Sequence, residues 1–418
     1  MIAGRNLLFA KPLLIPFLLA SCLPIATAAK VIQVPQQQPT IQDGINAASN
    51  GDIVQVSPGT YTENINLNGK AITVVSVAGP KTTIIDGGHI SSVVTINSGE
   101  TPDSILKGFT IRNGTATENG GGGIMIYESS PTIEENIIEK NTACGGGGGG
   151  VFLDSSSADL KNNVIRNNAQ GNCSGGIGGG GIAVSGASSA QIIGNIIEKN
   201  SWSSASGGGI ALNGAGIPTI MNNIIASNSA YNNGGGICVG NSGHELIIQN
   251  LIIGNSANQG AGISLSVPES AVGPLLVSNT VANNLGATEG SALYVGGFDN
   301  EVELYNNIFT GPDGQNAVYC DPGNDQQPPL FANNDGYSSS GTGFQGTCSS
   351  ESGTNGNISA DPLFVNIEQH NYQLQAGSSA INAGDNNAPN LPKRDLANNR
   401  RVVDGTVDMG AYEYEGNN

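Results

Sequence analysis

The sequence predicts an all-β protein built as a parallel β-helix, in which the chain winds in coils of short strands. The first observation is a repeat: an asparagine followed by two mostly apolar residues occurs seven times in the middle of the chain. The repeated asparagines are Asn136, Asn163, Asn195, Asn223, Asn250, Asn279 and Asn307. Successive copies lie 27, 32, 28, 27, 29 and 28 residues apart, a period typical of solenoids. Residues about 28 positions apart should therefore be neighbours in adjacent coils.

The second observation is that each period contains three strand-like pieces. In the coil that starts near Gly122 these pieces are 123–127, 131–133 and 136–138. In the glycine-led piece, apolar residues expected to point inward alternate with variable residues expected to point outward. Neither a helical segment nor a leucine ladder accompanies the repeat, which argues against leucine-rich repeats of similar period. We expect about ten coils with three short strands in each.

Composition agrees with this fold and disfavours several classes of partner. The chain has 418 residues, of which 62 are glycine, and only 11% of its residues are charged. This composition describes neither a helical bundle nor a disordered acidic tail. The net charge of −18 disfavours nucleic acid and anionic membranes as partners. An anionic polymer such as pectin would also be repelled unless metal ions intervened.

The first 28 residues are predicted to be a secretory signal peptide. Two cations and an apolar stretch at 13–20 precede a small-residue cleavage site at 26–28. The alternative is a bacterial lipoprotein box at 19–22, in which Cys22 would carry a lipid anchor. No later segment is long and apolar enough to predict a transmembrane helix. We expect a monomer that is secreted or held at the bacterial outer surface.

The rest of the chain divides into three predicted parts. Residues 29–310 form the solenoid with its N-terminal cap, in which 40–48 is predicted to be a short amphipathic helix over the first coil. Residues 311–360 form an irregular, disulfide-containing insertion rich in proline, glycine and serine. Residues 361–418 form a C-terminal capping region that is expected to close the far end.

The cysteines predict two disulfides. Cys144 and Cys173 are 29 residues apart, and Cys320 and Cys348 are 28 apart, so each pair should lie on adjacent coils. Disulfides at these positions are consistent with export. Cys238 is left over, and we interpret it as a free thiol of no function rather than as a nucleophile.

Two polar columns are expected to run along the stack. The repeated asparagines should form a ladder whose amides hydrogen-bond from coil to coil, because buried polar groups need partners. A neighbouring column alternates in charge through Arg112, Glu139, Arg166 and Glu198. This column is predicted to be an exposed salt-bridge ladder worth about 0–1 kcal/mol per pair.

Segments near both ends of the mature chain resemble known families. Three of them, 40–45, 51–54 and 58–61, resemble the first turns of right-handed parallel β-helix proteins of the pectate-lyase-like superfamily. Three others look like the C-terminal region of bacterial surface proteins of the choice-of-anchor Q type. They are 361–364, 377–384 and 407–414. The resemblance implies a right-handed β-helix and export, but no single activity, because the fold hosts lyases, hydrolases, esterases and adhesins.

The outward columns of the glycine-led strands do not display a catalytic constellation. A uronan lyase needs a cation, usually Ca²⁺, and a lysine or arginine base. A galacturonan hydrolase needs several converging aspartates. These columns contain Asp154 as their only acid, with Glu128 at the flank, and no lysine, arginine or histidine. Catalytic residues are therefore unassigned, and the sequence leaves open whether the protein is an enzyme.

The same face is predicted to contact an extracellular polysaccharide. Small residues occupy its middle and aromatic residues lie nearer its ends, which would leave a shallow groove for a polymer. A featureless packing surface is the alternative reading of this face. The candidate binding residues are Tyr127, Glu128, Phe152, Asp154, Asn213 and Tyr294. The functional alternatives are a polysaccharide lyase or glycoside hydrolase with its site in loops, and a structural adhesin without a glycan ligand.

A calcium site near the C-terminus is a further hypothesis. Acidic residues accumulate between Asp385 and Glu413, and Ca²⁺ prefers carboxylate oxygens. Asp404 and Asp408 are the candidate ligands. The alternative reading is that these acids are solvated on the surface of the cap.

Overall fold

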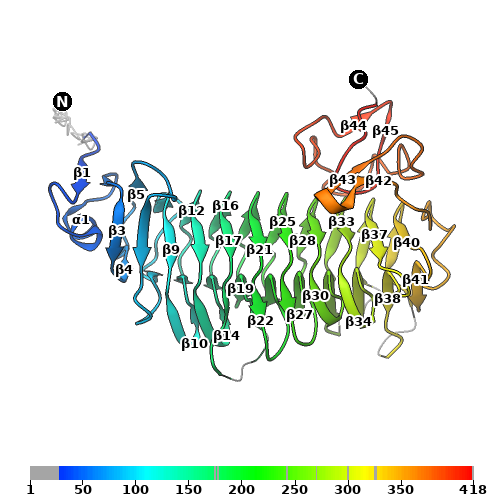
Figure 1. Cartoon of the computed structure of the whole chain (residues 1–418), viewed down its shortest axis with the longest axis horizontal. Helices are drawn as coiled ribbons and strands as arrows, with labels where there is room; N and C mark the ends of the chain where they lie inside the picture. The colour runs from blue at the N-terminus through cyan, green and yellow to red at the C-terminus, as the bar shows by residue number, and fades with distance from the viewer. Residues whose placement is uncertain are drawn as a thin grey trace, which may run out of the picture.

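The computed structural model describes residues 28–416, except 174, 175, 177, 242, 270, 299, 300 and 324–326. The predicted leader and Cys22 lie outside the described residues. The chain forms a parallel β-helix whose coils follow one another along the long axis (Figure 1). Three sheets of 11 or 12 strands run along the solenoid, which confirms the predicted fold class of about ten coils.

The strands of the solenoid belong to four sheets, which we name A to D. Sheet A contains β1 (Val31–Val34), β2 (Ile53–Val56), β5 (Thr73–Ser76), β8 (Ile105–Lys107), β12 (Thr132–Glu134), β16 (Asp159–Lys161), β20 (Gln191–Ile193), β24 (Thr219–Met221), β28 (Leu246–Ile248), β32 (Leu275–Val277), β36 (Glu303–Tyr305) and β39 (Leu330–Ala332). Sheet B contains β3 (Gly59–Thr62), β6 (Thr83–Asp86), β9 (Thr110–Arg112), β13 (Ile137–Glu139), β17 (Val164–Arg166), β21 (Ile196–Glu198), β25 (Ile224–Ala226), β29 (Leu251–Ile253), β33 (Thr280–Ala282), β37 (Ile308–Gly311) and β40 (Asp335–Ser338).

The other two sheets share the opposite side of each coil. Sheet C contains β4 (Ile65–Asn66), β7 (Val94–Ile96), β11 (Ile124–Tyr127), β15 (Val151–Asp154), β19 (Ile182–Ser185), β23 (Ile210–Asn213), β27 (Ile237–Asn241), β31 (Ile263–Val267), β35 (Leu293–Gly297), β38 (Val318–Cys320) and β41 (Phe344–Gly346). Sheet D contains β10 (Thr115–Gly121), β14 (Thr142–Gly148), β18 (Ala169–Gln170), β22 (Ser201–Trp202), β26 (Ser229–Ala230), β30 (Ser256–Gln259) and β34 (Leu285–Glu289).

A coil passes through the sheets in the order A, B, D, C. Sheets A, B and C hold the three predicted strand-like pieces of each coil, whereas sheet D was not predicted. Its strands lie in the glycine-rich segments between sheets B and C, and several have only two residues. Such short pieces show no apolar alternation that could have revealed them. The core is built from the inward residues of the other sheets, such as Ile126, Ile133 and Ile138, which are fully buried.

The asparagine ladder is present and extends two coils further than predicted, through Asn334 and Asn357. Asn195 shows the pattern. Its main-chain N–H and its carboxamide Nδ2 both donate to Oδ1 of Asn223, at 2.8 and 3.1 Å. The same Nδ2 donates to the Leu160 carbonyl at 2.9 Å, and Oδ1 of Asn195 accepts from Asn163. Every carboxamide is therefore buried and satisfied, as buried polar groups require.

A second ladder, absent from the sequence prediction, follows at the corner between sheets B and D. Its members lie five positions after those of the first ladder. They are Asn141, Asn168, Asn200, Asn228, Asn255 and Asn284. At both corners the residue before the asparagine is left-handed, as at Glu135 (φ 54°) and Lys140 (φ 57°). A left-handed residue followed by a ladder asparagine thus turns the chain sharply at two corners of each coil.

The charged column is in register, but its ion pairs are partly different from those expected. Arg112, Glu139, Arg166 and Glu198 occupy equivalent positions of adjacent sheet B strands. Arg166 pairs with Glu139 at 2.8 Å, whereas Arg112 pairs with Asp86 at 2.9 Å. These side chains are partly exposed, so each pair contributes about 1 kcal/mol or less.

The predicted N-terminal helix is α1 (Ile41–Ala47), which covers the first coil. The hydroxyl of Thr40 accepts a hydrogen bond from the N–H of Asp43 and caps the helix. A side chain at Gly44 would begin 2.8 Å from Val54, so glycine permits this close approach. Among the residues described, no helix has the length and apolar character needed to cross a bilayer.

Both predicted disulfides are formed. The Cα atoms of Cys144 and Cys173 are 5.9 Å apart, and those of Cys320 and Cys348 are 5.7 Å apart. Cys238 is a free, buried cysteine, and burial raises the pKa of its thiol to about 12. A thiol that stays protonated and covered is a poor nucleophile. This burial argues against the nucleophilic alternative for Cys238.

The C-terminal segment was expected to close the end of the solenoid. Instead, it folds back along the side of the solenoid (Figure 1). It contains β42 (Phe364–Asn366), a short 3₁₀ turn (Ile367–Gln369), β43 (Asn371–Leu374), β44 (Val402–Val403) and β45 (Thr406–Val407). Tyr372 packs with Leu251 and Ile253 of sheet B, and the N–H of Ala411 donates to the hydroxyl of Thr280 at 2.9 Å. Sheet B turns apolar on its outer face in these coils, which explains the docking.

Replacing one ladder asparagine should destabilise the solenoid. Asn223→Ala removes the acceptor of two Asn195 donors and the donor to the Ile192 carbonyl. Each buried polar group left unsatisfied costs roughly 1–3 kcal/mol, so the free energy of unfolding should fall by about 3 kcal/mol. Urea denaturation followed by circular dichroism measures this loss. Asn232→Ala is the matched control, because Asn232 is exposed and outside both ladders; equal losses in the two variants would contradict the role of the ladder.

Candidate functional site

The face predicted to form the groove is the outer face of sheet C, and its first outward column is covered. Phe152 is only 4% exposed, and Ala211 and Cys238 farther along the column are also buried. The glycine-rich chain that precedes each sheet C strand lies directly on these residues. Side chains at Gly207 and Gly234 would begin 2.6 Å from the Cβ atoms of Ala211 and Cys238. This cover corrects the expectation of an open groove along the middle of the face.

The second outward column remains partly open and holds three of the six sequence-predicted binding residues. Tyr127, Asp154, Ser185 and Asn213 occupy equivalent positions on adjacent strands. Phe152, Asp154 and Asn213 line one small cavity of about 140 Å³. This volume is below the roughly 300–1,000 Å³ that is usual for ligand sites. The structure therefore brings these three residues together, but in a space too small for a polymer segment.

Tyr127 and Glu128 lie at the N-terminal end of this column and are exposed. A hydrogen bond to Glu128 and the charges of Glu128 and Asp154 raise the pKa of the Tyr127 hydroxyl. Tyr294 lies far along the same sheet and is separate from the others. Its hydroxyl donates to Asp321 at 2.8 Å, and its ring stacks on Tyr319 with centroids 5.9 Å apart.

The proposed calcium ligands do not come together. Asp404 is exposed in the turn between β44 and β45, whereas Asp408 is 1% exposed. Both carboxylate oxygens of Asp408 accept main-chain hydrogen bonds, from Asn382 and Tyr414. Within the described ranges, no group of three or more histidine, cysteine, aspartate or glutamate side chains is arranged to hold a metal ion.

The buried acids of the C-terminal segment have a structural role instead. Asp395, Asp408 and Glu413 each accept two hydrogen bonds from main-chain N–H groups of this segment. Arg401 is fully buried within electrostatic reach of all three, and it donates to the carbonyls of Asp408 and Gly410. Burial raises the pKa of Glu413 to about 7. Carboxylates thus replace strand pairing as the partners of main-chain amides in a segment with little regular structure.

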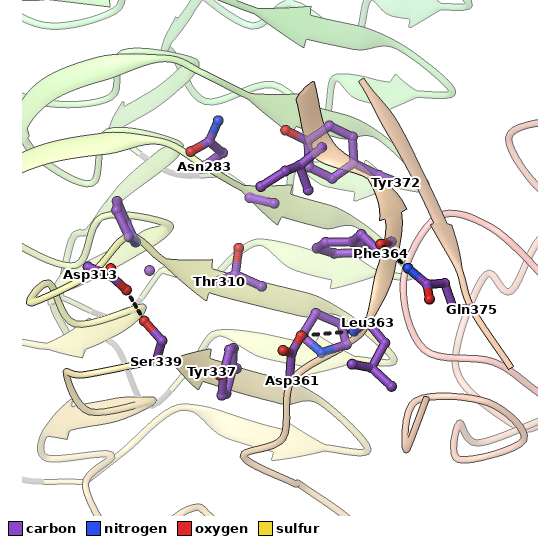
Figure 2. Close-up of a pocket in the computed structure, with 15 residues that line it drawn as sticks. Asn283, Thr310, Asp313, Tyr337, Ser339, Asp361, Leu363, Phe364, Tyr372 and Gln375 are labelled. Atoms are coloured by element: carbon purple, nitrogen blue, oxygen red, sulfur yellow. Dashed lines mark hydrogen bonds between the residues drawn. The ribbon is translucent and has the colours of Figure 1, made fainter. Parts of the chain in front are cut away.

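A larger cleft lies where the C-terminal segment meets sheet B, and we call it the seam cleft. Its volume is about 620 Å³ (Figure 2). Ala282, Thr310 and Tyr337, from the outer face of β33, β37 and β40, form the floor. Residues 361–364, together with Ile367, Tyr372 and Gln375, form the wall. The cleft therefore joins side chains from three coils with a segment that arrives later in the sequence.

The walls of the seam cleft combine aromatic rings with hydrogen-bonding groups. Phe364 and Tyr372 pack edge to face, with ring centroids 5.1 Å apart. The Tyr372 hydroxyl is buried and approaches Asn283 without forming a hydrogen bond of normal geometry. Asp361 accepts a hydrogen bond from the N–H of Leu363 at 2.9 Å. The wall is thus fixed by its own contacts while its polar groups face the cleft.

Tyr337 occupies the floor between two acids (Figure 2). Asp313 lies on one side, where it accepts a hydrogen bond from Ser339, and Asp361 lies on the other. Tyr337 is half-buried. Its pKa is raised by burial first and then by the charges of Asp361, Asp313 and Asp335. The ring therefore lies within the electrostatic field of three carboxyl groups.

Asp335 lies behind this floor, at the start of β40, and is fully buried. Its Oδ1 accepts a hydrogen bond from the N–H of Ala360 at 3.1 Å, and its Oδ2 has no partner. Burial raises the pKa of its carboxyl group to about 8, and nearby Asp361 acts in the same direction. A neutral carboxyl group thus anchors the chain just before it enters the cleft wall.

Sequence reasoning missed the seam cleft because the C-terminal segment was expected at the end of the solenoid. One signal was available. The charged outward column of sheet B changes from Glu139, Arg166 and Glu198 to Ala226 and Ile253 in the following coils. An apolar outer face on a solenoid needs a cover, and the remaining non-repetitive segment could supply it.

Comparison with known proteins agrees with this architecture. The sequence matches the right-handed beta helix region at residues 64–216 and 149–327, which together cover more than half of the chain. The chain belongs to this family. No curated protein sequence matches this right-handed β-helix chain.

One solved structure shares the fold at low sequence identity, and two others are more distant matches. The crystal structure of pectate lyase Pel9A has a TM-score of 0.54 and 15% identity, over 93% of this chain and 97% of that chain. A XylC complex with xylose has a TM-score of 0.47 and 14% identity, over 89% and 67%. A mannuronic-acid-specific family 6 polysaccharide lyase from human gut microbiota has a TM-score of 0.32 and 12% identity, over 81% and 87%. The first likeness supports the β-helix fold alone.

Asp335 should make stability depend on pH. Its folded-state pKa of about 8 exceeds the value of roughly 3.9 for an unfolded chain. The stability associated with the neutral group is therefore complete below about pH 4 and is lost progressively as pH rises toward 8. Asp335→Asn should raise the urea midpoint more at the upper end of this range than at the lower end. Asp103→Asn, at an exposed acid, is the control; an equal shift of D335N at both ends would contradict the assignment.

Proposed function

We propose that the protein binds an extracellular polysaccharide and that the seam cleft holds part of the polymer. The observation that carries this proposal is the combination of Tyr337 on the floor with polar groups around it. A sugar ring has apolar faces that pack on aromatic rings and hydroxyl groups that need hydrogen-bond partners. Asp313, Asp361 and the hydroxyl of Thr310 supply such partners. The cleft volume of about 620 Å³ suits a short stretch of saccharide.

The seam cleft replaces the outer face of sheet C as the main binding surface in this proposal. Phe152 is covered, and Tyr294 already uses its hydroxyl for Asp321. Tyr127, Glu128 and Asp154 remain candidates for a secondary contact at the open edge of sheet C. The fold that this chain shares with a pectate lyase supports polysaccharides as the class of ligand, but it does not indicate a particular polysaccharide.

A glycoside hydrolase is the second candidate function. Asp313 and Asp361 lie on opposite sides of the cleft floor (Figure 2), and glycosidases use two carboxyl groups that flank the scissile bond. A lyase is less well supported, because the residues that line the cleft include no lysine, arginine or histidine to act as the base. Release of reducing ends from a polysaccharide panel would favour the hydrolase over a binding protein.

We further propose that the protein acts outside the cytoplasm. Two disulfides on adjacent coils support an oxidising environment. Secretion through the predicted leader, surface attachment of the choice-of-anchor Q type and a monomeric state remain parts of this proposal, and a lipid anchor at Cys22 is the alternative to plain cleavage of the leader. Fractionation of the native host, with and without Cys22→Ser, tests the mode of attachment.

Removing the ring on the cleft floor should weaken glycan binding. Tyr337→Ala deletes the aromatic face on which a sugar would pack, and an aromatic contact of roughly 1–1.5 kcal/mol corresponds to about a tenfold loss of affinity. A glycan array followed by calorimetry on the best ligand measures this loss. Tyr231→Ala is the matched control, since Tyr231 is 63% exposed and directly follows β26 of sheet D, away from the cleft lining. Undiminished binding by the Tyr337 variant would place the ligand elsewhere.

A further inference from the structure

The charged side chains that line the seam cleft are all negative. Among the residues that line it, the charged side chains are Asp313 and Asp361, and both are exposed carboxylates. Asp335 lies behind the floor, but its raised pKa of about 8 keeps it neutral, so the charge of the cleft comes from the other two acids. The chain as a whole carries a net charge of −18. Both the local and the overall field therefore repel an anionic polymer and attract a cationic one.

The aromatic floor adds to the same preference. Tyr337 lies between the two carboxylates (Figure 2), and both act on the pKa of its hydroxyl. The face of an aromatic ring attracts an ammonium group, because the ring carries negative charge density above its plane. An ammonium group above Tyr337 would thus meet the ring and have a carboxylate on either side.

A third feature points to a ligand with hydroxyl groups. Thr310 on the floor and Gln375 on the wall place a hydroxyl and a carboxamide at the lining of the cleft. Such groups can donate hydrogen bonds to saccharide hydroxyls and accept hydrogen bonds from them.

We infer that the seam cleft is selective for a saccharide that carries amino groups, such as a polymer of glucosamine. This inference rests on the proposed function and names its substrate class. The ammonium group binds above Tyr337 between Asp313 and Asp361, and a ring hydroxyl pairs with a polar side chain of the lining such as Thr310. An N-acetylated polymer keeps the ring contact but loses the charge contact, and a uronan is repelled.

Calorimetry with matched oligosaccharides tests this selectivity. Glucosamine oligomers, their N-acetylated counterparts and galacturonan oligomers of equal length are titrated into the full chain at slightly acidic pH, where the amines are protonated. An exposed charge pair is worth about 0–1 kcal/mol, or up to roughly fivefold in affinity. Two carboxylates should therefore give the glucosamine oligomer an advantage of about tenfold, which shrinks as salt is added.

Two variants and a control locate the effect. Asp313→Asn and Asp361→Asn should each lower the affinity for the glucosamine oligomer by about threefold to fivefold and leave the N-acetylated oligomer unchanged. Asp103→Asn removes an equally exposed acid far from the cleft and should change neither affinity. Circular dichroism of each variant confirms that the fold is retained.

Each outcome separates the inference from the function on which it rests. A salt-sensitive advantage for the glucosamine oligomer that both cleft variants reduce supports the inference. Equal affinity for the glucosamine oligomer and its N-acetylated counterpart overturns the inference, and so does galacturonan binding that requires added calcium. In both cases the proposal of polysaccharide binding stands. No binding by any oligomer overturns both the inference and the proposed function.

Discussion

The two asparagine ladders are the constraint on which the structure depends. The coils that carry both ladders turn sharply at the corners between sheets A and B and between sheets B and D, where a left-handed residue precedes a buried asparagine. The strands between these corners are often only three residues long, so few main-chain hydrogen bonds act within each strand pair. The carboxamides satisfy the corner amides and carbonyls that the turns leave unpaired, and they fix the vertical alignment of successive coils. The other columns of these coils share the register that the ladders fix.

The repeat made the fold predictable, because the ladder and the apolar alternation are both local patterns. Sheets A, B and C, the first ladder and both disulfides follow from residues spaced by one period, and the N-terminal helix follows from its own amphipathic pattern. The second ladder was also readable, since Asn141, Asn168 and Asn200 recur five positions after the first series. Sheet D was not readable, because its strands lie within glycine-rich segments. The same glycines led to the wrong groove, since their lack of side chains allows the chain to cover Phe152 and Ala211.

The candidate site was beyond the reach of periodic reasoning. Its wall comes from a segment without a repeat, and the contacts that dock this segment join residues as distant as Thr280 and Ala411, 131 positions apart. Nothing in the spacing of the sequence indicates such a contact. Its physical cause is the apolar outer face of sheet B around Leu251 and Ile253, which the segment covers. Where the cover diverges from the sheet, Tyr337 and its flanking acids remain open to a ligand. The regular solenoid thus provides a rigid floor, and the irregular segment provides the shape and charge of the cleft.

Hydrogen exchange of the asparagine carboxamides tests the central role of the ladders most directly. In protein labelled with ¹⁵N at asparagine, the account predicts that the side-chain amides of Asn195, Asn223 and Asn250 exchange only through global unfolding, as slowly as the best-protected main-chain amides. Exchange of these groups at the rate of the exposed Asn232 carboxamide would contradict the account, because it would show that the corners are held by something other than the ladder.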